Sequence, residues 1–348
     1  MKRTDILLRS ENIRRYVLEN IGKNPRGIAS LIASQFKISR QAATRYLTQM
    51  VKDGQLAAEG TTKDRSYRVG VIKNFTKEYD LKVYRDESQI WSEDFSPLFK
   101  NVPANIAHIF EYGFTEMVNN VIDHSEGKVL RAGFKRSPGD IFISVRDDGI
   151  GIFKKIKDAC NLSDERQSIL ELSKGKLTTD PAKHTGEGIF FSSRIFDYFG
   201  ISSHELVFSH SIDIENDFLL HQKEETKGTI VYMDMKLDSK KELRNVFDEY
   251  SKTPGEYSFD KTIVPVRLAQ YEGADILSRS QAKRLMARVE NFKVVVLDFE
   301  GVQSIGPAFA DEIFRVYKNE HPNVELSTIN TSEEVLKMIN RVSSPSET

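Results

Sequence analysis

Three short segments, in a fixed order along the chain, most restrict what this sequence can fold into. Glu116 and Asn120 stand four residues apart in an apolar helical pattern, so both side chains project from one helix face. Further on, Asp147 ends a strand-like run and enters a glycine turn, and Gly186 and Gly188 open a second helical pattern. Each segment alone is a weak signal. Together they indicate one site that is built from a strand and two helices.

The residue types in these segments suit a nucleotide that is bound with Mg²⁺. Glu116 offers a base and Asn120 an amide oxygen to the same Mg²⁺-bound phosphate. Asp147 can accept a hydrogen bond from an exocyclic amine, and the glycines after it let a ring lie against the backbone. The helix start at Gly186 and Gly188 suits phosphate, because its N–H groups and its dipole favour anions. The three segments therefore predict an ATP site.

The same segments resemble the motifs of the GHKL ATPase superfamily, the Bergerat-fold group of histidine kinases, gyrase, the heat-shock chaperone and anti-sigma kinases. Residues 116–120 resemble its N box, 147–151 its G1 box and 185–188 its G2 box. Residues 227–229 resemble the Gly-Thr pair on a late strand of the family. The resemblance covers about residues 100–237. It implies an α/β sandwich, a mixed sheet with helices on one face.

By that resemblance each residue has an expected role. Glu116 is the general base for water or for an acceptor hydroxyl, and Asn120 binds Mg²⁺. Asp147 accepts from the adenine amine, and Thr229 supports adenine through water. The further residues expected to contact the nucleotide are Gly149, Gly151, Lys183, Thr185, Gly186 and Gly188.

The polar stretch 152–184 lies between the second and third segments and contains one short predicted helix at 163–173. Loops this long inside a compact domain are usually functional, and we expect this one to be a lid that ATP orders. Lys183 would reach phosphate from the lid, with a solvated lysine as the alternative. His184 stands where the G2 box often begins with glycine, so lid closure is expected to differ from that of the family.

The first 73 residues are basic, with 15 Lys/Arg against 6 Asp/Glu. Three helical patterns, the third capped by Ser39, precede strands at 55–58 and 66–69 that flank a basic turn. This order resembles a winged helix-turn-helix, which implies duplex DNA as a partner. The expected groove contacts are Ser39, Arg40, Gln41, Thr44 and Arg45, and the expected wing contacts are Lys63 and Arg65. Docking to a protein, as many winged helices do, is the open alternative.

From about residue 255 the pattern becomes that of a small separate α/β domain. Strands at 262–268, 294–299 and 324–329 alternate with helices at 278–289, 308–317 and 332–342. The segment resembles a STAS-like domain of the DUF4325 type, mainly through the run that ends at Asp298 and the turn 301–306. STAS antagonists carry a phosphorylatable hydroxyl where this chain has Gly306-Pro307-Ala308. We therefore expect a partner of the ATP domain and not its phosphorylation substrate.

Composition supplies the remaining expectations. No apolar run is long enough to span a bilayer, no signal peptide is visible, and Cys160 is the only cysteine. These features favour a cytoplasmic protein without an intrachain disulfide. We expect a multi-domain α+β chain: a winged helix at 1–73, a GHKL ATP-binding domain with its linker at 74–250, and a STAS-like domain at 255–348.

Two functions of different classes remain open at this point. The first is a bacterial transcriptional regulator that couples ATP and Mg²⁺ binding to DNA binding. The second is a serine/threonine protein kinase of the anti-sigma type, or a slow ATPase, whose winged helix binds a protein partner. A homodimer and a protein partner for the STAS-like domain are compatible with both.

Overall fold

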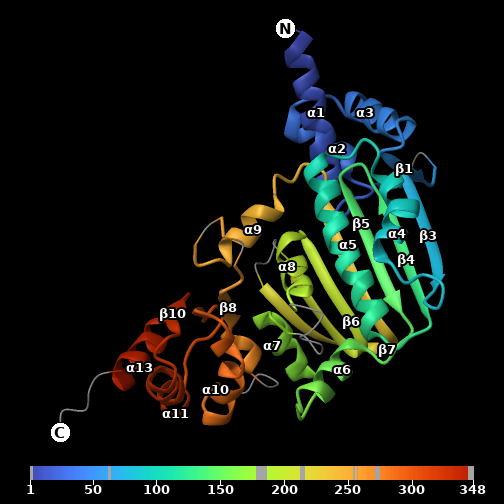
Figure 1. Cartoon of the computed structure of the whole chain (residues 1–348). Coiled ribbons are helices and arrows are strands. Elements are labelled where there is room, and N and C mark those ends of the chain that lie inside the picture. The colour runs from blue at the N-terminus through green and yellow to red at the C-terminus, as the bar shows by residue number, and fades with distance from the viewer. Residues whose placement is uncertain are drawn as a thin grey trace. The chain divides into compact units, whose positions relative to one another are not determined.

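The computed structural model describes residues 3–61, 64–177, 186–211, 216–253, 255–256, 258–270 and 275–343 (Figure 1). Two compact units can be distinguished. One consists of Met1–Glu78, Arg131–Ser144 and Asp234–Ser239, and the other of Tyr79–Leu130, Val145–Met233 and Lys240–Thr348. Helices and several sheets mix along the chain, so the expected multi-domain α+β class is confirmed, while the three domain boundaries stay a prediction. Among the described helices, none combines the length and apolar character of a membrane span.

The N-terminal part consists of three helices and a hairpin, as predicted: α1 (Arg3–Asn20), α2 (Ile28–Phe36), α3 (Arg40–Lys52), β1 (Leu56–Glu59) and β2 (Ser66–Val69). Ser39 caps α3, since its Oγ accepts from the backbone N of Ala42 at 3.1 Å. Ile13, Ile32 and Leu47 are fully buried in one core that the apolar stripes of the helices share. β1 and β2 pair antiparallel. Arg40, Gln41, Thr44 and Arg45 of α3 lie outside this core and are exposed.

The central sheet has the strand order β3-β4-β5-β7-β6. Its strands are β3 (Lys73–Asp80), β4 (Val129–Arg136), β5 (Asp140–Asp147), β6 (Tyr198–Ser211) and β7 (Asn216–Lys236). β4 and β5 are antiparallel neighbours, because the short connection 137–139 cannot make a parallel crossover. Along β5, alternate residues are buried, and Asp147 continues that buried series at the end of the strand. A carboxylate is thereby directed toward the core.

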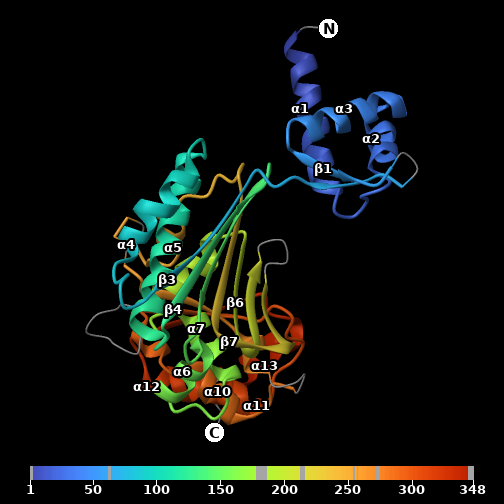
Figure 2. The same cartoon turned by 90° about the vertical axis from the view of Figure 1, so that its right-hand side faces the viewer.

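The long helix α5 (Ala104–His124) runs along one face of this sheet (Figures 1 and 2). Its apolar side chains recur at helical spacing and are buried. A side chain at Gly113 would collide with Phe196 and approach Met233 of β7, so α5 and β7 pack closely at this glycine. Glu116 lies one turn further along the same helix. Trp91, beside α4 (Glu87–Ile90), is buried against Phe95 and Phe99, as expected of a packing residue.

Two predictions in this region were wrong. The sequence pattern predicts three strands here, at 204–211, 214–222 and 228–236, but the structure has two long strands, β6 and β7. β7 continues through its charged stretch because polar side chains find partners there: Gln222 Nε2 donates to His204 O at 2.6 Å and to Thr226 Oγ1 at 2.7 Å. The helical pattern that opens at Gly186 and Gly188 predicts a helix at 187–199, but the helix ends earlier, as α8 (Gly188–Ile195).

Between the second and third motif segments the structure has two helices, α6 (Ile152–Ala159) and α7 (Arg166–Lys174). The sequence predicted only the latter. Most of α7 is buried, including Ile169, Leu170 and Leu172. The described part of the expected lid is therefore packed helix, and residues 178–185 lie outside the described residues.

The C-terminal part has the predicted βαβαβα order: β8 (Lys261–Pro265), α10 (Arg279–Met286), β9 (Val294–Asp298), α11 (Pro307–Asp311), β10 (Glu325–Ile329) and α13 (Glu333–Ser343). The three strands are parallel in the order β10-β9-β8. Ser278 and Gln281 form a capping box at the start of α10. This agreement follows from the strongly apolar β9, whose middle residues are buried.

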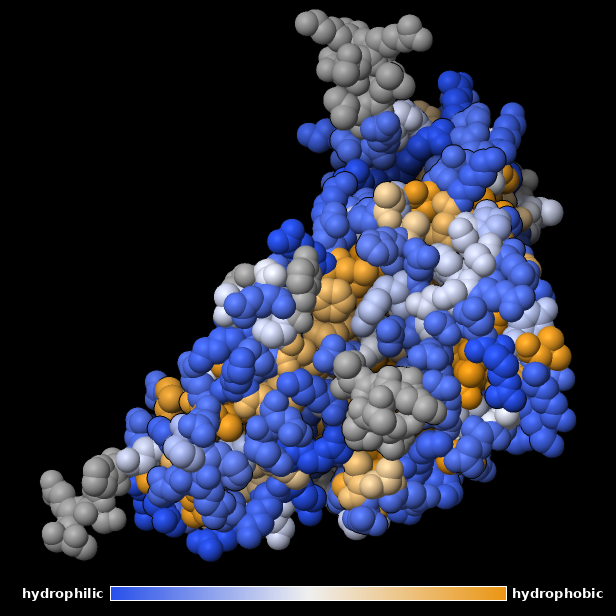
Figure 3. All heavy atoms as spheres, viewed as in Figure 1, coloured by the Kyte–Doolittle hydropathy of each residue, from blue (hydrophilic) through white to orange (hydrophobic). Residues whose placement is uncertain are grey.

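The hydrophobic core of the C-terminal part also includes residues from helices α7 and α8. Leu170, Phe190 and Phe191 belong to the same buried cluster as Val264 and Leu297. Partly buried side chains lie against this cluster: Tyr112, Val246 and Phe247, the last two from α9 (Leu243–Glu249). Apolar residues reach the surface as a strip in the region of α8 and α9 (Figure 3). Helix α7 and helix α8, which begins at the candidate site residue Gly188, are thus packed into the C-terminal core.

Candidate functional site

One cavity of about 360 Å³ gathers residues from all three motif segments. The predicted residues that line it are Glu116, Asn120, Asp147, Gly151, Gly186, Gly188 and Thr229. Gly149 lines a neighbouring depression instead. Lys183 and Thr185 lie outside the described residues. Segments separated by more than a hundred residues thus meet at a cavity of the size that small-molecule sites have.

Asp147 is a buried carboxylate in the wall of this cavity, with 4% of its surface exposed. Burial raises its pKa, and hydrogen bonds from Gly149 and Thr229 act in the opposite direction. The Gly149 bond joins N–H to Oδ1 at 2.8 Å. Thr229 Oγ1 in turn accepts from Ile152 N at 3.0 Å, which connects β7 to the start of α6. The carboxylate is therefore held by the glycine turn and by β7.

The carboxylate of Asp148 binds backbone N–H groups and does not line the cavity. Its Oδ1 accepts from the backbone N–H groups of Lys128 and Val129 at 2.7 and 3.0 Å. The bonds from Val129 and then Lys128 lower the pKa of Asp148. This carboxylate ties the glycine turn to the start of β4.

Two glycines allow close approaches around the site. Gly228 has φ +71°, and a Cβ there would collide with the backbone of Asp147. A Cβ at Gly188 would collide with the carboxylate of Glu116. The first residue of α8 thus lies directly against Glu116, and a larger residue at position 188 would displace that carboxylate.

A tyrosine and two carboxylates share the region around the start of α8. Burial raises the pKa of Tyr112, and the charges of Glu116 and Glu187 add to that effect. Glu187 also lines the cavity, although the sequence did not single it out. The residue lies inside the G2-like segment, so its place beside two expected nucleotide contacts was the signal that could have found it.

Lys155 of α6 is a second lining residue that the sequence analysis missed. Its Nζ donates to His124 O at 2.7 Å and forms an ion pair with Glu126 at 3.1 Å. Among the described lining residues it is the single Lys or Arg. No sequence signal distinguished it from Lys154 and Lys157 of the same helix. The part of the cavity wall that the structure describes therefore has one ammonium group beside the carboxylates.

The described residues contain no cluster of three or more His, Cys, Asp or Glu side chains with metal-site geometry. A magnesium ion that arrives with phosphates needs only one or two protein ligands, because the phosphate oxygens and water supply the others. Asn120 and Glu116, both in the cavity wall, fit that lesser requirement. Apolar side chains, among them Met117, Val145 and Ile156, complete the wall and suit a flat ring.

The residues predicted to contact DNA lie on the exposed side of α3 and in the hairpin. Ser39, Arg40, Gln41, Thr44 and Arg45 are all exposed. Thr44 Oγ1 donates to Arg40 O at 2.9 Å, so this hydroxyl already has a partner in its own helix. Arg65 is exposed and lies over the ring of Tyr67, 5.5 Å from its centre. Lys63 lies outside the described residues.

A known protein family matches the C-terminal part of the chain. Residues 281–336 match the family model of a STAS-like domain of unknown function (DUF4325). The C-terminal prediction is confirmed at this level. In the structure the matched segment runs from α10 into α13. The helix after the turn 301–306 begins at Pro307, with Gly306 as its N-cap, so no hydroxyl stands at this helix start. No curated protein matches the chain.

Proposed function

We propose that this chain is an ATP- and Mg²⁺-binding transcriptional regulator in which the nucleotide state controls binding to duplex DNA. One observation carries the proposal: Glu116, Asn120, Asp147, Gly188 and Thr229, which come from four different elements, line one cavity. In this reading residues 100–237 form a GHKL-type ATP-binding domain, and residues 1–73 form a winged helix-turn-helix.

Each part of the nucleotide has a suitable partner in the cavity. The adenine amine would donate to Asp147, since an ionised carboxylate can accept further hydrogen bonds besides those from Gly149 and Thr229. Phosphates would lie between the start of α8 and Lys155, where N–H groups and an ammonium favour anions. Asn120 would hold Mg²⁺, which neutralises phosphate charge when bound.

The DNA part of the proposal is supported by exposure and charge. Arg40, Gln41 and Arg45 project from the first half of α3 and are not used in its core. A basic recognition helix of this kind can enter the major groove, and the Arg65 side chain on the hairpin can reach the backbone.

The place of Glu116 supports a second function, a serine/threonine kinase or slow ATPase of the same family. Its carboxylate lies against the first residue of α8, beside the expected terminal phosphate. There it would take the proton of water or of an acceptor hydroxyl as that oxygen attacks the phosphorus, and ADP would leave. In this case the exposed face of α3 would dock a protein.

One experiment separates the two functions. Full-length protein is titrated onto a pool of labelled duplex DNA at several salt concentrations, with and without Mg-ATP, while ATP binding and turnover are followed in parallel. The regulator is supported if Mg-ATP changes DNA affinity. Turnover without any DNA binding at low salt supports the enzyme, and absence of ATP binding excludes both.

A further inference from the structure

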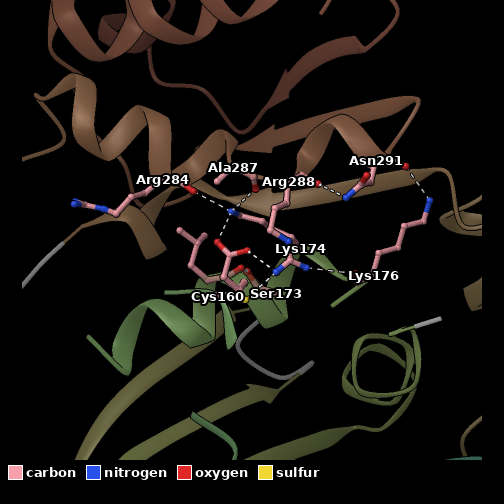
Figure 4. A network of polar contacts seen from close by, with 10 residues as sticks. Cys160, Ser173, Lys174, Lys176, Arg284, Ala287, Arg288 and Asn291 are labelled. Atoms are coloured by element: carbon pink, nitrogen blue, oxygen red, sulfur yellow. Dashed lines mark hydrogen bonds and ion pairs between the residues drawn. The ribbon is translucent and has the colours of Figure 1, made fainter. Parts of the chain in front are cut away.

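A buried lysine of α7 donates hydrogen bonds to backbone carbonyls of the STAS-like region. Lys174 is 2% exposed, and its Nζ donates to the carbonyl oxygens of Arg284 and Ala287, each at 2.9 Å (Figure 4). The third partner is Glu171 Oε1 at 2.8 Å. Arg284 and Ala287 lie at the end of α10, where the last carbonyls of a helix lack partners and favour a cation. All three protons of this ammonium group are therefore used.

A second lysine makes the same kind of contact two residues later. Lys176 Nζ donates to Asn291 O at 3.0 Å and lies 4.6 Å from the ring centre of Phe292. Between the two lysines, Gly175 has φ +81° and lies so close to the ring of Phe259 that a Cβ would collide with it. The backbone at the end of α7 thus rests directly on the C-terminal part.

Two further contacts fix the position of α7 along this surface. Thr262 of β8 is fully buried, and its Oγ1 donates to the carbonyl of Lys174 at 2.7 Å. Arg288 donates to Cys160 Sγ at 3.1 Å and lies 3.7 Å from Glu171 Oε2, which links the end of α6 to the same place (Figure 4). Hydrogen bonds weaken when their distances and angles change, so these contacts hinder sliding of α7 along the STAS-like region.

The other side of the same short stretch forms the wall of the candidate site. Leu172 and Leu177 line the cavity. Gly186 packs on the backbone of Leu177 so closely that a Cβ at 186 would overlap it. Within 172–177, Leu172 and Leu177 thus face the cavity, and Lys174 and Lys176 between them bond to the STAS-like region.

We propose that the end of α10 and the 3-10 helix Val289–Asn291 form the interaction surface of the STAS-like region, that its partner is α7 of the same chain, and that this contact transmits the nucleotide state of the cavity. The inference rests on the proposed function, because it concerns control of that same site. A ligand that holds Leu172 and Leu177 in place also holds Lys174 and Lys176 on their carbonyls. Coupling of this kind is reciprocal, so the contact must in turn strengthen ATP binding.

The test uses full-length variants that cut single contacts and keep side-chain volume. Lys176→Met removes the bond to Asn291, and Thr262→Val removes the buried hydroxyl. Lys337→Met is the matched control, since Lys337 is 77% exposed on α13. Two quantities are measured: the dissociation rate of a fluorescent ATP analogue, and hydrogen exchange of residues 281–292 with and without Mg-ATP.

We expect ATP to slow exchange of residues 281–292 in the wild type and in Lys337→Met. In Lys176→Met and Thr262→Val the analogue should dissociate about fivefold faster or more, and the ATP-dependent protection should disappear. A role in stability alone would lower the melting temperature without removing that protection. If Thr262→Val does not fold, Lys176→Met alone tests the inference, because Lys176 is partly exposed.

Wild-type rates and wild-type protection in both variants would overturn the inference and leave the proposed function intact. A wild-type protein that does not bind ATP would overturn the proposed function first, and this inference with it.

Discussion

The carboxylates of Asp147 and Asp148 have different surroundings although the two residues are adjacent. Asp147 is buried in the cavity wall and is held by Gly149 and Thr229. Asp148 binds the backbone of Lys128 and Val129. The pair therefore offers a matched comparison, because the same substitution at either position should affect a different property.

At position 147 the affected property is nucleotide affinity. Asp147→Asn replaces an acceptor by a donor opposite the adenine amine, and the buried mismatch should cost about 1–3 kcal/mol of binding. Calorimetry with ATP measures this loss. Asp148→Asn is the control and should bind as the wild type does. Unchanged affinity in Asp147→Asn would contradict the assignment of the adenine contact.

At position 148 the affected property is stability and its dependence on pH. The pKa of Asp148 is lowered in the folded state, so its stabilisation is fully present above the ordinary carboxyl pKa of about 3.9 and is lost as pH falls below it. Asp148→Asn should lower the free energy of unfolding by about 1 kcal/mol at neutral pH. Urea unfolding between pH 7 and 3 should show the difference from wild type shrinking toward the acid end. A constant difference would refute this account.

Lys155 should act on phosphate and not on the base. Lys155→Met is expected to weaken ATP binding about tenfold, a typical loss for one charge-assisted contact, and to leave adenosine binding unchanged. Lys154→Met supplies the control from the same helix, since Lys154 is exposed and pairs with Asp158. Equal losses for ATP and adenosine would show that Lys155 acts through the packing of α6 instead.

Glu116 should matter for turnover more than for binding. Glu116→Ala should retain ATP and lose about 10²–10⁴-fold in hydrolysis or transfer, the usual contribution of a positioned base. Asn120→Ala should instead lose the part of the affinity that depends on Mg²⁺. Radiolabelled ATP reports both quantities. If the wild type shows no turnover with any partner, the protein is a binding switch and Glu116 has no catalytic role.

The exposed basic residues of the N-terminal part should divide into two kinds of DNA contact. Arg65→Ala should weaken all sequences alike and lower the slope of affinity against salt by about one unit, whereas Arg40→Ala should blunt sequence preference. Lys337→Ala, on α13, is the control. Anisotropy titrations on specific and random duplexes measure both effects. No binding of any duplex at low salt would favour the protein-docking alternative.

The sequence predicted those features that depend on local periodicity. The helical spacing of Glu116 and Asn120 and the strand alternation that ends at Asp147 were enough to direct these side chains toward one place. The C-terminal βαβαβα order followed from the apolar run of β9 and from the helical pattern at 278–289. Each of these signals lies within a few neighbouring residues.

Features that depend on packing between distant segments were not predictable in this way. Lys154, Lys155 and Lys157 are equivalent in sequence, and only the packing of α6 decides which one reaches the cavity. The contacts of Lys174 and Lys176 are with backbone carbonyls more than a hundred residues away, and any residue type supplies a carbonyl. The polar residues 223–227 led to a predicted gap between two strands where β7 is continuous, because their cross-strand partners could not be known.

The shared core also changes how the C-terminal part should be tested. Deletion of residues 255–348, which the sequence alone would suggest, removes Phe259, whose ring packs against both Phe190 and Phe191. The large apolar surface that this deletion uncovers would itself disturb α8. Substitutions of single contacts avoid this effect.

In the contact between the α7 segment and the STAS-like region, mutation can remove the lysine donors but not the main-chain acceptors. On the STAS-like side the acceptors are main-chain oxygens at positions 284, 287 and 291, which persist whatever side chain is present. On the α7 side the donors are two lysine ammonium groups that most substitutions would remove. Related chains that keep this contact should therefore vary freely in side chain at those three positions while retaining a long cationic residue at 174 and 176. Genetic suppressors of a lysine loss should arise in α7 or in the segment after it, and seldom in α10.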